Sequence, residues 1–141
     1  MGKLKTPDSI LFKSRSLDST EYDEIRHHPE DGADILKKVK SLQKYVPPVR
    51  HHHEYYDGKG YPDGLYGDKI PLYAAIISIA DTFDAMTSNR SYRRALSKTE
   101  AFEELEKEAG KQFHPVLVKA FLRAMENGKQ SALHSSLAKV I

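Results

Sequence analysis

The feature that most constrains the fold of this chain is an apolar segment that begins after Pro71. Apolar residues recur in it at helical spacing, at Ala75, Ile76, Ile79, Phe83 and Met86. Its other sides are apolar as well, at Ala74, Ile77 and Ala80. A helix of this kind must be covered nearly all round by its neighbours. We therefore expect it to be the central core helix of an all-α domain.

Two aspartates interrupt this apolar helix. Asp81 and Asp84 are three residues apart, which places both carboxylates on one face. In a dry core each carboxylate would need a cation or hydrogen-bond partner, because an unpaired buried charge is costly. For Asp81 the pattern favours a metal ion, and a buried salt bridge is the alternative.

Composition limits the class of protein. The chain has 141 residues, of which 39% are hydrophobic and 30% charged, with a mean hydropathy of −0.61. These values predict one helical domain over residues 1–126, followed by a weakly patterned tail or short helix over 127–141. The longest apolar run, Tyr73 to Ala80, is too short to span a membrane, and no apolar leader is present. The cytoplasm is the expected location, and a net charge of +2 does not indicate nucleic-acid binding.

Histidines cluster directly before a glycine-rich turn. His51-His52-His53-Glu54 is followed by Gly58, Gly60, Pro62 and Gly64, residues that favour a sharp and rigid loop. Because the chain has no Cys, any metal must be held by imidazole and carboxylate, which favours Fe, Mn or Zn in a hydrolytic site. The alternative is a solvated histidine patch. His51 is expected on the solvent side.

Helix start signals place these histidines at helix ends. Asp18 with Glu21 is a capping box for a helix ending at about His27. His28 precedes Pro29 in an elbow, and the next helix runs to about Leu42. His28 is therefore either a metal ligand or a histidine that neutralises the carbonyl end of the preceding helix. His27 would point elsewhere.

The remaining helices begin at similarly clear signals. A short helix that starts at Pro47 carries His52 and His53 at its far end. Ser97 with Glu100 forms a second capping box, for a helix closed by Gly110, and Pro115 opens a last helix that extends to about Met125.

A polar loop follows the aspartate-bearing helix. It contains Arg90, Arg93 and Arg94, whose guanidinium groups match phosphate oxygens bidentately. The alternative is a solvated basic loop. With His28, His52, His53 and Asp81, these arginines suit the metal-dependent hydrolysis of a phosphodiester.

At these residues the chain resembles the HD-GYP family of bacterial phosphodiesterases, a branch of the HD-domain metal hydrolases. The matching motifs follow one another from about Gly2 to Met125. They are Gly2-Lys3, His28-Pro29 with Gly32, His52-His53-Glu54, Asp57-Gly58 with Gly60-Tyr61-Pro62, Ala80-Asp81 with Phe83-Asp84-Ala85-Met86-Thr87, and Arg90-Ser91-Tyr92-Arg93.

The resemblance implies an HD-domain-like helical bundle with a GYP-type C-terminal helical extension and a centre of two or three metal ions, Fe or Mn first and then Zn or Ni. It implies cyclic di-GMP as the substrate class. The implied metal ligands are His28, His52, His53 and Asp81, with Asp81 and Lys3 in catalytic roles. The implied substrate-binding residues are Lys3, Tyr61, Asp84, Arg90 and Arg93.

The beginning of the chain departs from this family. There, a His-Asp pair stands one residue before the segment that matches Gly2-Lys3, and here Met1 occupies that place. The pair and the first helices would then be missing, which predicts impaired activity and an apolar face covered in a homodimer or larger oligomer. The alternatives are a non-catalytic module that binds a cyclic dinucleotide or a protein such as a diguanylate cyclase, and a purely structural fragment.

Overall fold

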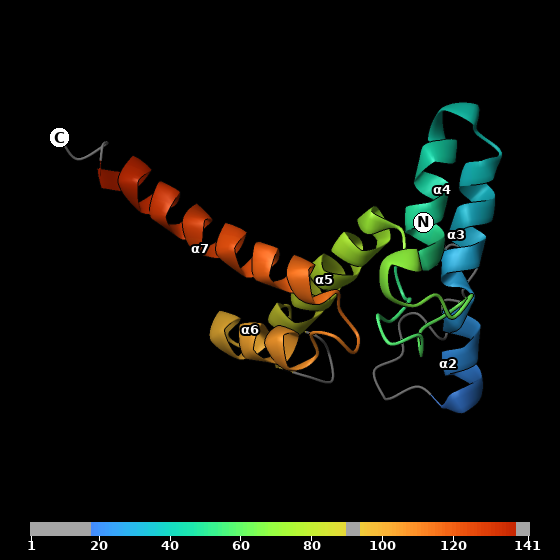
Figure 1. Ribbon diagram of the computed structural model, residues 1–141, viewed down its shortest axis with the longest axis horizontal. Coiled ribbons are helices and arrows are strands. Elements are labelled where there is room, and N and C mark those ends of the chain that lie inside the picture. Colours follow the sequence, from blue (N-terminus) through green and yellow to red (C-terminus); the bar gives the residue numbers. More distant parts are fainter. Residues whose placement is uncertain (1–17, 90–93, 138–141) are drawn as a thin grey trace.

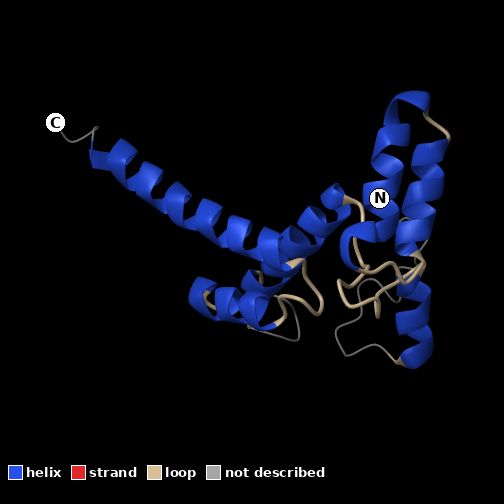
Figure 2. Ribbon diagram, in the orientation of Figure 1, coloured by secondary structure: helices blue, strands red, loops and turns tan. Residues whose placement is uncertain are grey.

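The computed structural model describes residues 18–89 and 94–137, with side chains described as far as Asn127. Within these residues all regular elements are helices, so the predicted all-α class is confirmed (Figures 1 and 2). The α-helices are α2 (Ser19–Arg26), α3 (His28–Lys37), α4 (Val46–His51), α5 (Leu72–Thr87), α6 (Lys98–Lys107) and α7 (Pro115–Leu137). Two 3₁₀-helices, η2 (Lys40–Tyr45) and η3 (Gly67–Lys69), lie in the connections.

The helices form two groups that meet at α5. On one side α3 and α4 pack side by side, with α2 continuing the line of α3, and on the other side α5, α6 and α7 pack together (Figure 1). The connection from α4 to α5 is the glycine-rich loop, which lies at the foot of α3 and α4. This arrangement brings the histidines of α3 and α4 to the same end of the molecule as the loop.

Most helix starts lie where the sequence predicts them. The side chains of Asp18 and Ser97 each accept a hydrogen bond from the backbone N–H of the glutamate three residues on, and the carboxylate of that glutamate accepts one from the backbone N–H of the cap residue, so both capping boxes are confirmed. Pro71 directly precedes α5, and Pro115 is the first residue of α7. Local hydrogen-bond chemistry is sufficient to set these boundaries.

The predicted end of α3 near Leu42 is wrong. The helix ends at Lys37, and Val39 adopts an extended conformation with φ −116° and ψ 111°. The amides of Lys38 and Val39 donate to the carbonyls of Ile35 and Leu36, three residues back, which tightens the last turn. The short η2 then reverses the chain, so that α4 packs along α3. Apolar spacing alone did not reveal this reversal.

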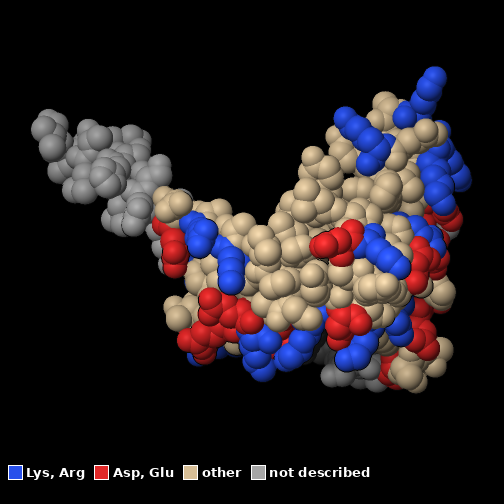
Figure 3. Space-filling view, in the orientation of Figure 1, with Lys and Arg blue, Asp and Glu red and all other residues tan. Residues whose placement is uncertain are grey.

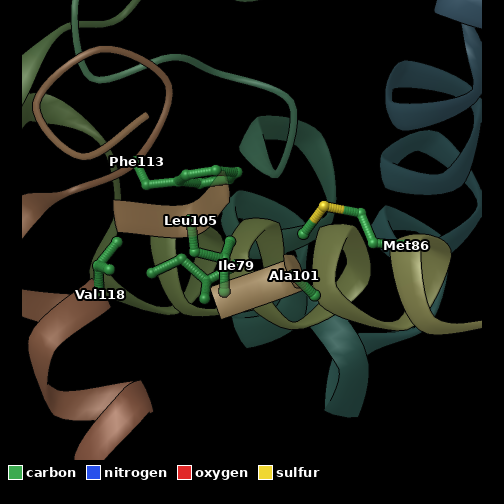
Figure 4. Close-up of a cluster of buried hydrophobic side chains, with 6 residues drawn as sticks. All are labelled: Ile79, Met86, Ala101, Leu105, Phe113 and Val118. Carbon is green, nitrogen blue, oxygen red and sulfur yellow. The ribbon is translucent and has the colours of Figure 1, made fainter. Parts of the chain in front are cut away.

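The main apolar core joins the second group of helices. Figure 4 shows its six buried side chains, which come from α5, α6, α7 and the segment before α7. They are Ile79, Met86, Ala101, Leu105, Phe113 and Val118. Phe83 stacks on Phe102 at a centroid distance of 5.4 Å and extends this core towards its edge.

The expectation that α5 is covered nearly all round is wrong. Leu72 is 58% exposed, Tyr73 69% and Ile76 43%, while the buried positions Ala74, Ser78, Ile79 and Met86 lie on other sides of the helix. An uncharged surface extends between α5 and α7 (Figure 3). An apolar pattern predicts a helix, but it does not determine how many neighbours cover that helix.

The C-terminal helix is longer than predicted. It continues from Pro115 to Leu137 without a break at Asn127-Gly128. A single interior glycine costs a helix only about 1 kcal/mol, which the surrounding helix-favouring residues offset. Figure 1 shows α7 extending away from the other helices. Among the described helices, none combines the length and apolar character that crossing a membrane requires.

Candidate metal centre

Three histidines meet where α3 and α4 lie side by side. His28 is the first residue of α3, and His52 and His53 directly follow α4. The Nε2 atom of His28 lies 3.3 Å from Nε2 of His52 and 3.1 Å from Nε2 of His53. The elbow at His28-Pro29 and the end of α4 thus bring His28 together with a pair of imidazoles that lies 24 and 25 residues further along the sequence.

Backbone carbonyls orient two of these rings. Nδ1 of His28 donates to the carbonyl of Ile25 at 2.6 Å, and Nδ1 of His52 donates to the carbonyl of Val49 at 2.7 Å. These carbonyls lie near the ends of α2 and α4, where a helix has no intrahelical donors left. With the proton on Nδ1, a neutral imidazole presents Nε2 as an acceptor. His28 therefore caps the preceding helix with one nitrogen and faces the other histidines with the second.

This arrangement fits a divalent metal ion. One ligand nitrogen from each of His28, His52 and His53 lies within 4.8 Å of the others. Imidazoles that share one ion bind it at about 2.0–2.1 Å, and their outer nitrogens are typically held by carbonyl or carboxylate oxygens. Here three imidazole nitrogens lie close enough together to share one ion, and carbonyl oxygens hold the outer nitrogens of His28 and His52. The chain has no Cys, so it offers no thiolate ligand.

The neighbouring histidines lie apart from this group. The side chain of His27 is 67% exposed, and its Nδ1 lies 3.5 Å from Glu30, so the expectation that it points elsewhere is confirmed. The expectation that His51 lies on the solvent side is wrong. Its side chain is only 13% exposed, and its Nδ1 lies 3.6 Å from Glu54 and 3.5 Å from Asp63.

Tyr61 forms the lip of the site, a term we use for residues 60–65. Its ring stacks on the imidazole of His53, with centroids 4.9 Å apart and an interplanar angle of 18°. The guanidinium of Arg26 lies 4.7 Å from the centroid of the same ring. Burial raises the pKa of Tyr61 well above its usual value, and the charge of Asp81 is a smaller cause in the same direction. The phenol therefore stays protonated and can donate a hydrogen bond at the edge of the site.

The aspartates of α5 lie apart from the histidine group. Asp81 and Asp84 are both exposed, so the expectation that they carry buried charges is wrong. Asp81 lies outside the group of three histidines. Asp84 accepts a hydrogen bond from the Ser88 hydroxyl at 3.4 Å. Both aspartates are exposed because part of α5 has no covering helix among the described residues, which the spacing of apolar residues did not predict.

Three predicted site residues lie outside the described residues: Lys3, Arg90 and Arg93. Sequence reasoning also missed a residue. Glu54 is 2% exposed, and its carboxylate binds the backbone of the lip. A glutamate beside three histidines suggests a metal ligand or a solvated charge. The one signal in the sequence that could have indicated the burial of Glu54 is the glycine-rich segment that follows it, because such a segment is able to fold back over the carboxylate.

The chain is similar in sequence to a known protein family and to several phosphodiesterases. A family model described as an HD domain matches residues 1–117. The cyclic di-GMP phosphodiesterase response regulator RpfG of Xanthomonas campestris is 41% identical over 125 residues, which cover 87% of this chain and 33% of that protein. A cyclic di-GMP phosphodiesterase of Thermotoga maritima is 40% identical, with 87% of this chain and 34% of that protein covered. A 3'3'-cGAMP-specific phosphodiesterase of Vibrio cholerae is 40% identical, with 86% and 24% covered.

Solved structures share the fold. A cyclic GMP-AMP-specific phosphodiesterase from V. cholerae superposes with a TM-score of 0.65 at 24% identity and covers 79% of this chain and 26% of its own. An HDG"Y"P protein from Bdellovibrio bacteriovorus gives a TM-score of 0.65 at 19% identity, with 89% of this chain and 40% of its own covered. The chain spans about a third of the first two curated relatives and about a quarter of the third.

Proposed function

This chain belongs to the family of HD domains, and on that premise we propose that it acts as a metal-dependent phosphodiesterase domain on a cyclic dinucleotide. The premise rests on the match over residues 1–117 and on relatives named as cyclic di-GMP phosphodiesterases that are 41% and 40% identical. Cyclic di-GMP is the proposed substrate, as in the names of those relatives, and a cyclic GMP-AMP is the nearest variant of the same chemistry.

The observation that carries the proposal is the convergence of three imidazole Nε2 atoms, two of which, those of His28 and His52, belong to rings whose Nδ1 donates to a backbone carbonyl. We take His28, His52 and His53 as the metal ligands. Asp81 remains a proposed ligand and catalytic residue on the resemblance alone. Fe or Mn is the proposed ion, followed by Zn or Ni, because all the donors are nitrogen or oxygen. When bound, such an ion activates water and stabilises the charge that develops on a phosphoryl group.

The chain's own residues would hold the substrate beside this centre. The protonated Tyr61 hydroxyl is available to donate to a phosphate or base oxygen. Asp84 on α5 is exposed and could accept from a guanine edge. Lys3, Arg90 and Arg93 are proposed phosphate-binding residues on the resemblance, with guanidinium forks suited to phosphate oxygens.

Hydrolysis assays test this function. Cyclic di-GMP incubated with the protein and Mn²⁺ or Fe²⁺ is expected to yield the linear dinucleotide, detected by chromatography. His53→Ala should abolish the product because it removes a proposed ligand, whereas the matched control His27→Ala should retain it because His27 lies outside the group. Equal activity of wild type and His53→Ala would contradict the assignment, as would the absence of product with every metal.

One observation favours a second function. Asp81 lies outside the histidine group, so three ligand side chains converge instead of four. A module with such a site could bind a cyclic dinucleotide, or a diguanylate cyclase-type protein, without cleaving it. Calorimetry with cyclic di-GMP and Mn²⁺ distinguishes the two. Binding heat without product supports the module, and product formation supports the enzyme.

The predicted association into a homodimer also remains a proposal. The surface it would cover is the exposed apolar face of α5, with Leu72, Tyr73, Ile76 and Ile77. Light scattering at micromolar concentration should then give the mass of two chains, or of more in a larger oligomer. A single-chain mass would contradict it.

A further inference from the structure

The lip has no helix or strand of its own, and a buried carboxylate fastens it. Glu54 follows the ligand pair directly and is 2% exposed, although an unpaired carboxylate is among the costliest groups to bury. Its Oε1 accepts from the amide of Asp63 at 2.8 Å, and its Oε2 accepts from the amide of Leu65 at 3.0 Å. Both carboxylate oxygens are thus used to hold the far end of the lip.

The near end of the lip lies directly on the backbone of the histidine segment. A Cβ atom at Gly60 would stand 2.2 Å from the amide nitrogen of Tyr55 and 2.5 Å from the carbonyl oxygen of His53. The amide of Tyr61 donates to that same carbonyl at 3.1 Å. The lip is therefore tied at both ends to residues 53 and 54, and the backbone of Tyr61 itself makes the near tie.

The consequence of this fastening is the position of one aromatic ring. Tyr61 covers one face of His53 with near-parallel planes, and Arg26 lies over the Tyr61 ring. A ring stacked in this way restricts rotation of the imidazole, which must aim Nε2 at the other two histidines. Loss of the tie at Glu54 would release the lip and with it the orientation of His53.

We propose that Glu54 is a positioning residue that holds Tyr61 on His53 through the backbone of the lip and thereby fixes the aim of a proposed metal ligand. The proposal rests on the proposed function, since the orientation of His53 affects metal binding only if His53 is a ligand. Removal of second-shell partners of this kind typically weakens metal binding about 10–100-fold.

A different assignment for the same residues is a second metal site. The ligand atoms of His51, Glu54 and Asp63 lie within 4.8 Å of one another. However, Arg50 donates to both carboxylate oxygens of Asp63, at 2.9 and 2.8 Å, and also pairs with Glu30 at 3.0 Å. A metal ion would face this guanidinium and would displace the backbone bonds of Glu54. The cluster is therefore a set of ties between α3, α4 and the lip.

Glu54→Gln tests the role with a minimal change of shape. The amide keeps one acceptor oxygen and presents an NH₂ group to a backbone N–H, so one tie to the lip is lost. Glu103→Gln is the matched control, because it removes the same charge from an exposed position on α6. Circular dichroism and the melting temperature establish that each variant is folded.

The first readout is the NMR spectrum of the histidine rings in metal-free protein. The stacked Tyr61 ring should shift the ring protons of His53 upfield, and Glu54→Gln should move them towards the positions of exposed His27, while Glu103→Gln leaves them in place. The second readout is the Kd for Mn²⁺ by calorimetry, which should rise about tenfold in Glu54→Gln alone. A purely structural role would lower the melting temperature and leave both readouts unchanged, which would overturn the proposal.

If Glu54→Gln does not fold, Tyr61→Leu and Tyr61→Phe test the same path. Leucine removes the stacked ring and should weaken Mn²⁺ binding, whereas phenylalanine keeps the ring and the affinity. Equal affinities of these two variants would overturn the proposal. If the wild-type protein binds none of Mn²⁺, Fe²⁺, Zn²⁺ and Ni²⁺, the proposed function fails, and the shift of the His53 resonances in the metal-free protein still decides the role of Glu54.

Discussion

The two sides of α5 are held together by different forces. On the side of α6 and α7, the core consists of apolar side chains such as Leu105 and Val118, both almost fully buried. On the side of α3 and α4, fewer apolar residues are buried, among them Ala33 and Leu36, and directed hydrogen bonds hold the lip in place. One side depends on burial of apolar area, and the other on the geometry of polar contacts.

This difference determines what a substitution can change. Apolar burial is roughly proportional to area and has no preferred direction, so a smaller side chain lowers stability and leaves distant geometry intact. Hydrogen bonds and stacked rings have direction, so the loss of one partner changes where its neighbour points. Substitutions on the α6–α7 side should therefore change the free energy of unfolding, and those at the lip should change metal binding.

The largest effect on stability is expected for Leu105→Ala. Leu105 is 0% exposed in the centre of the core, and its truncation should lower the free energy of unfolding by about 2–5 kcal/mol. Urea denaturation measures this value. Leu72→Ala on the exposed face of α5 is the control and should change stability by about 0.5 kcal/mol or less. At temperatures where Leu105→Ala is folded, its affinity for Mn²⁺ should equal that of the wild type; a weaker affinity would break the division between the two sides.

An intermediate effect is expected for Gly60→Ala. The added Cβ meets backbone atoms at 2.2–2.5 Å, so the lip must move, at a cost of about 1–3 kcal/mol. Gly67→Ala is the control, because it meets nothing within 4 Å and is strained only by a φ of +56°. Both variants should melt at lower temperature than the wild type, but only Gly60→Ala should bind Mn²⁺ more weakly. Equal Mn²⁺ affinities would show that the lip does not position the site.

The smallest effect is expected for Asp63→Asn, and it depends on pH. Hydrogen bonds from Arg50 hold the pKa of Asp63 below its usual value, so the ionised form stabilises the fold. That stabilisation is present above the unfolded pKa of about 3.9 and is lost as pH falls through the lower folded value. Because the side chain is 38% exposed, the variant should cost about 1 kcal/mol or less at pH 7.

Melting curves from pH 7 to pH 2 test this dependence. The difference between wild type and Asp63→Asn should shrink as the pH falls through the acid range, and added salt should reduce it at pH 7 because the pair is partly exposed. A difference that stays constant across the whole range would contradict the role given to the Arg50–Asp63 pair.

Local signals in the sequence predicted most of the helices. Asp18, Ser97 and Pro115 set helix starts through bonds or dihedral angles that involve only a few neighbouring residues. The end of α3 and the exposed face of α5 were not predictable in this way. Both depend on where other helices pack, because the chain reverses at Val39 to reach α3 again and no described helix covers Leu72.

The candidate metal centre likewise combines features that depend on neighbouring residues with features that depend on packing between distant segments. The places of His28, His52 and His53 at helix ends are local features, and their convergence follows from the packing of α3 on α4. The burial of Glu54 and His51 is not local, since it results from the lip folding back over them. The prediction for Asp81 assumed that its carboxylate is buried and needs a cation partner. That assumption is wrong because α5 is not covered all round and Asp81 is exposed.

The most direct test of the central claim is the number of metal ions per chain, by elemental analysis of protein purified without chelator or histidine tag. We predict at least one Fe, Mn or Zn ion per chain in the wild type and in His27→Ala, and a loss of that ion in His28→Ala. The two variants differ by one position, but only His28 directs Nε2 into the group. Wild-type protein without metal after loading with these ions, or His28→Ala with the full amount, would contradict the claim.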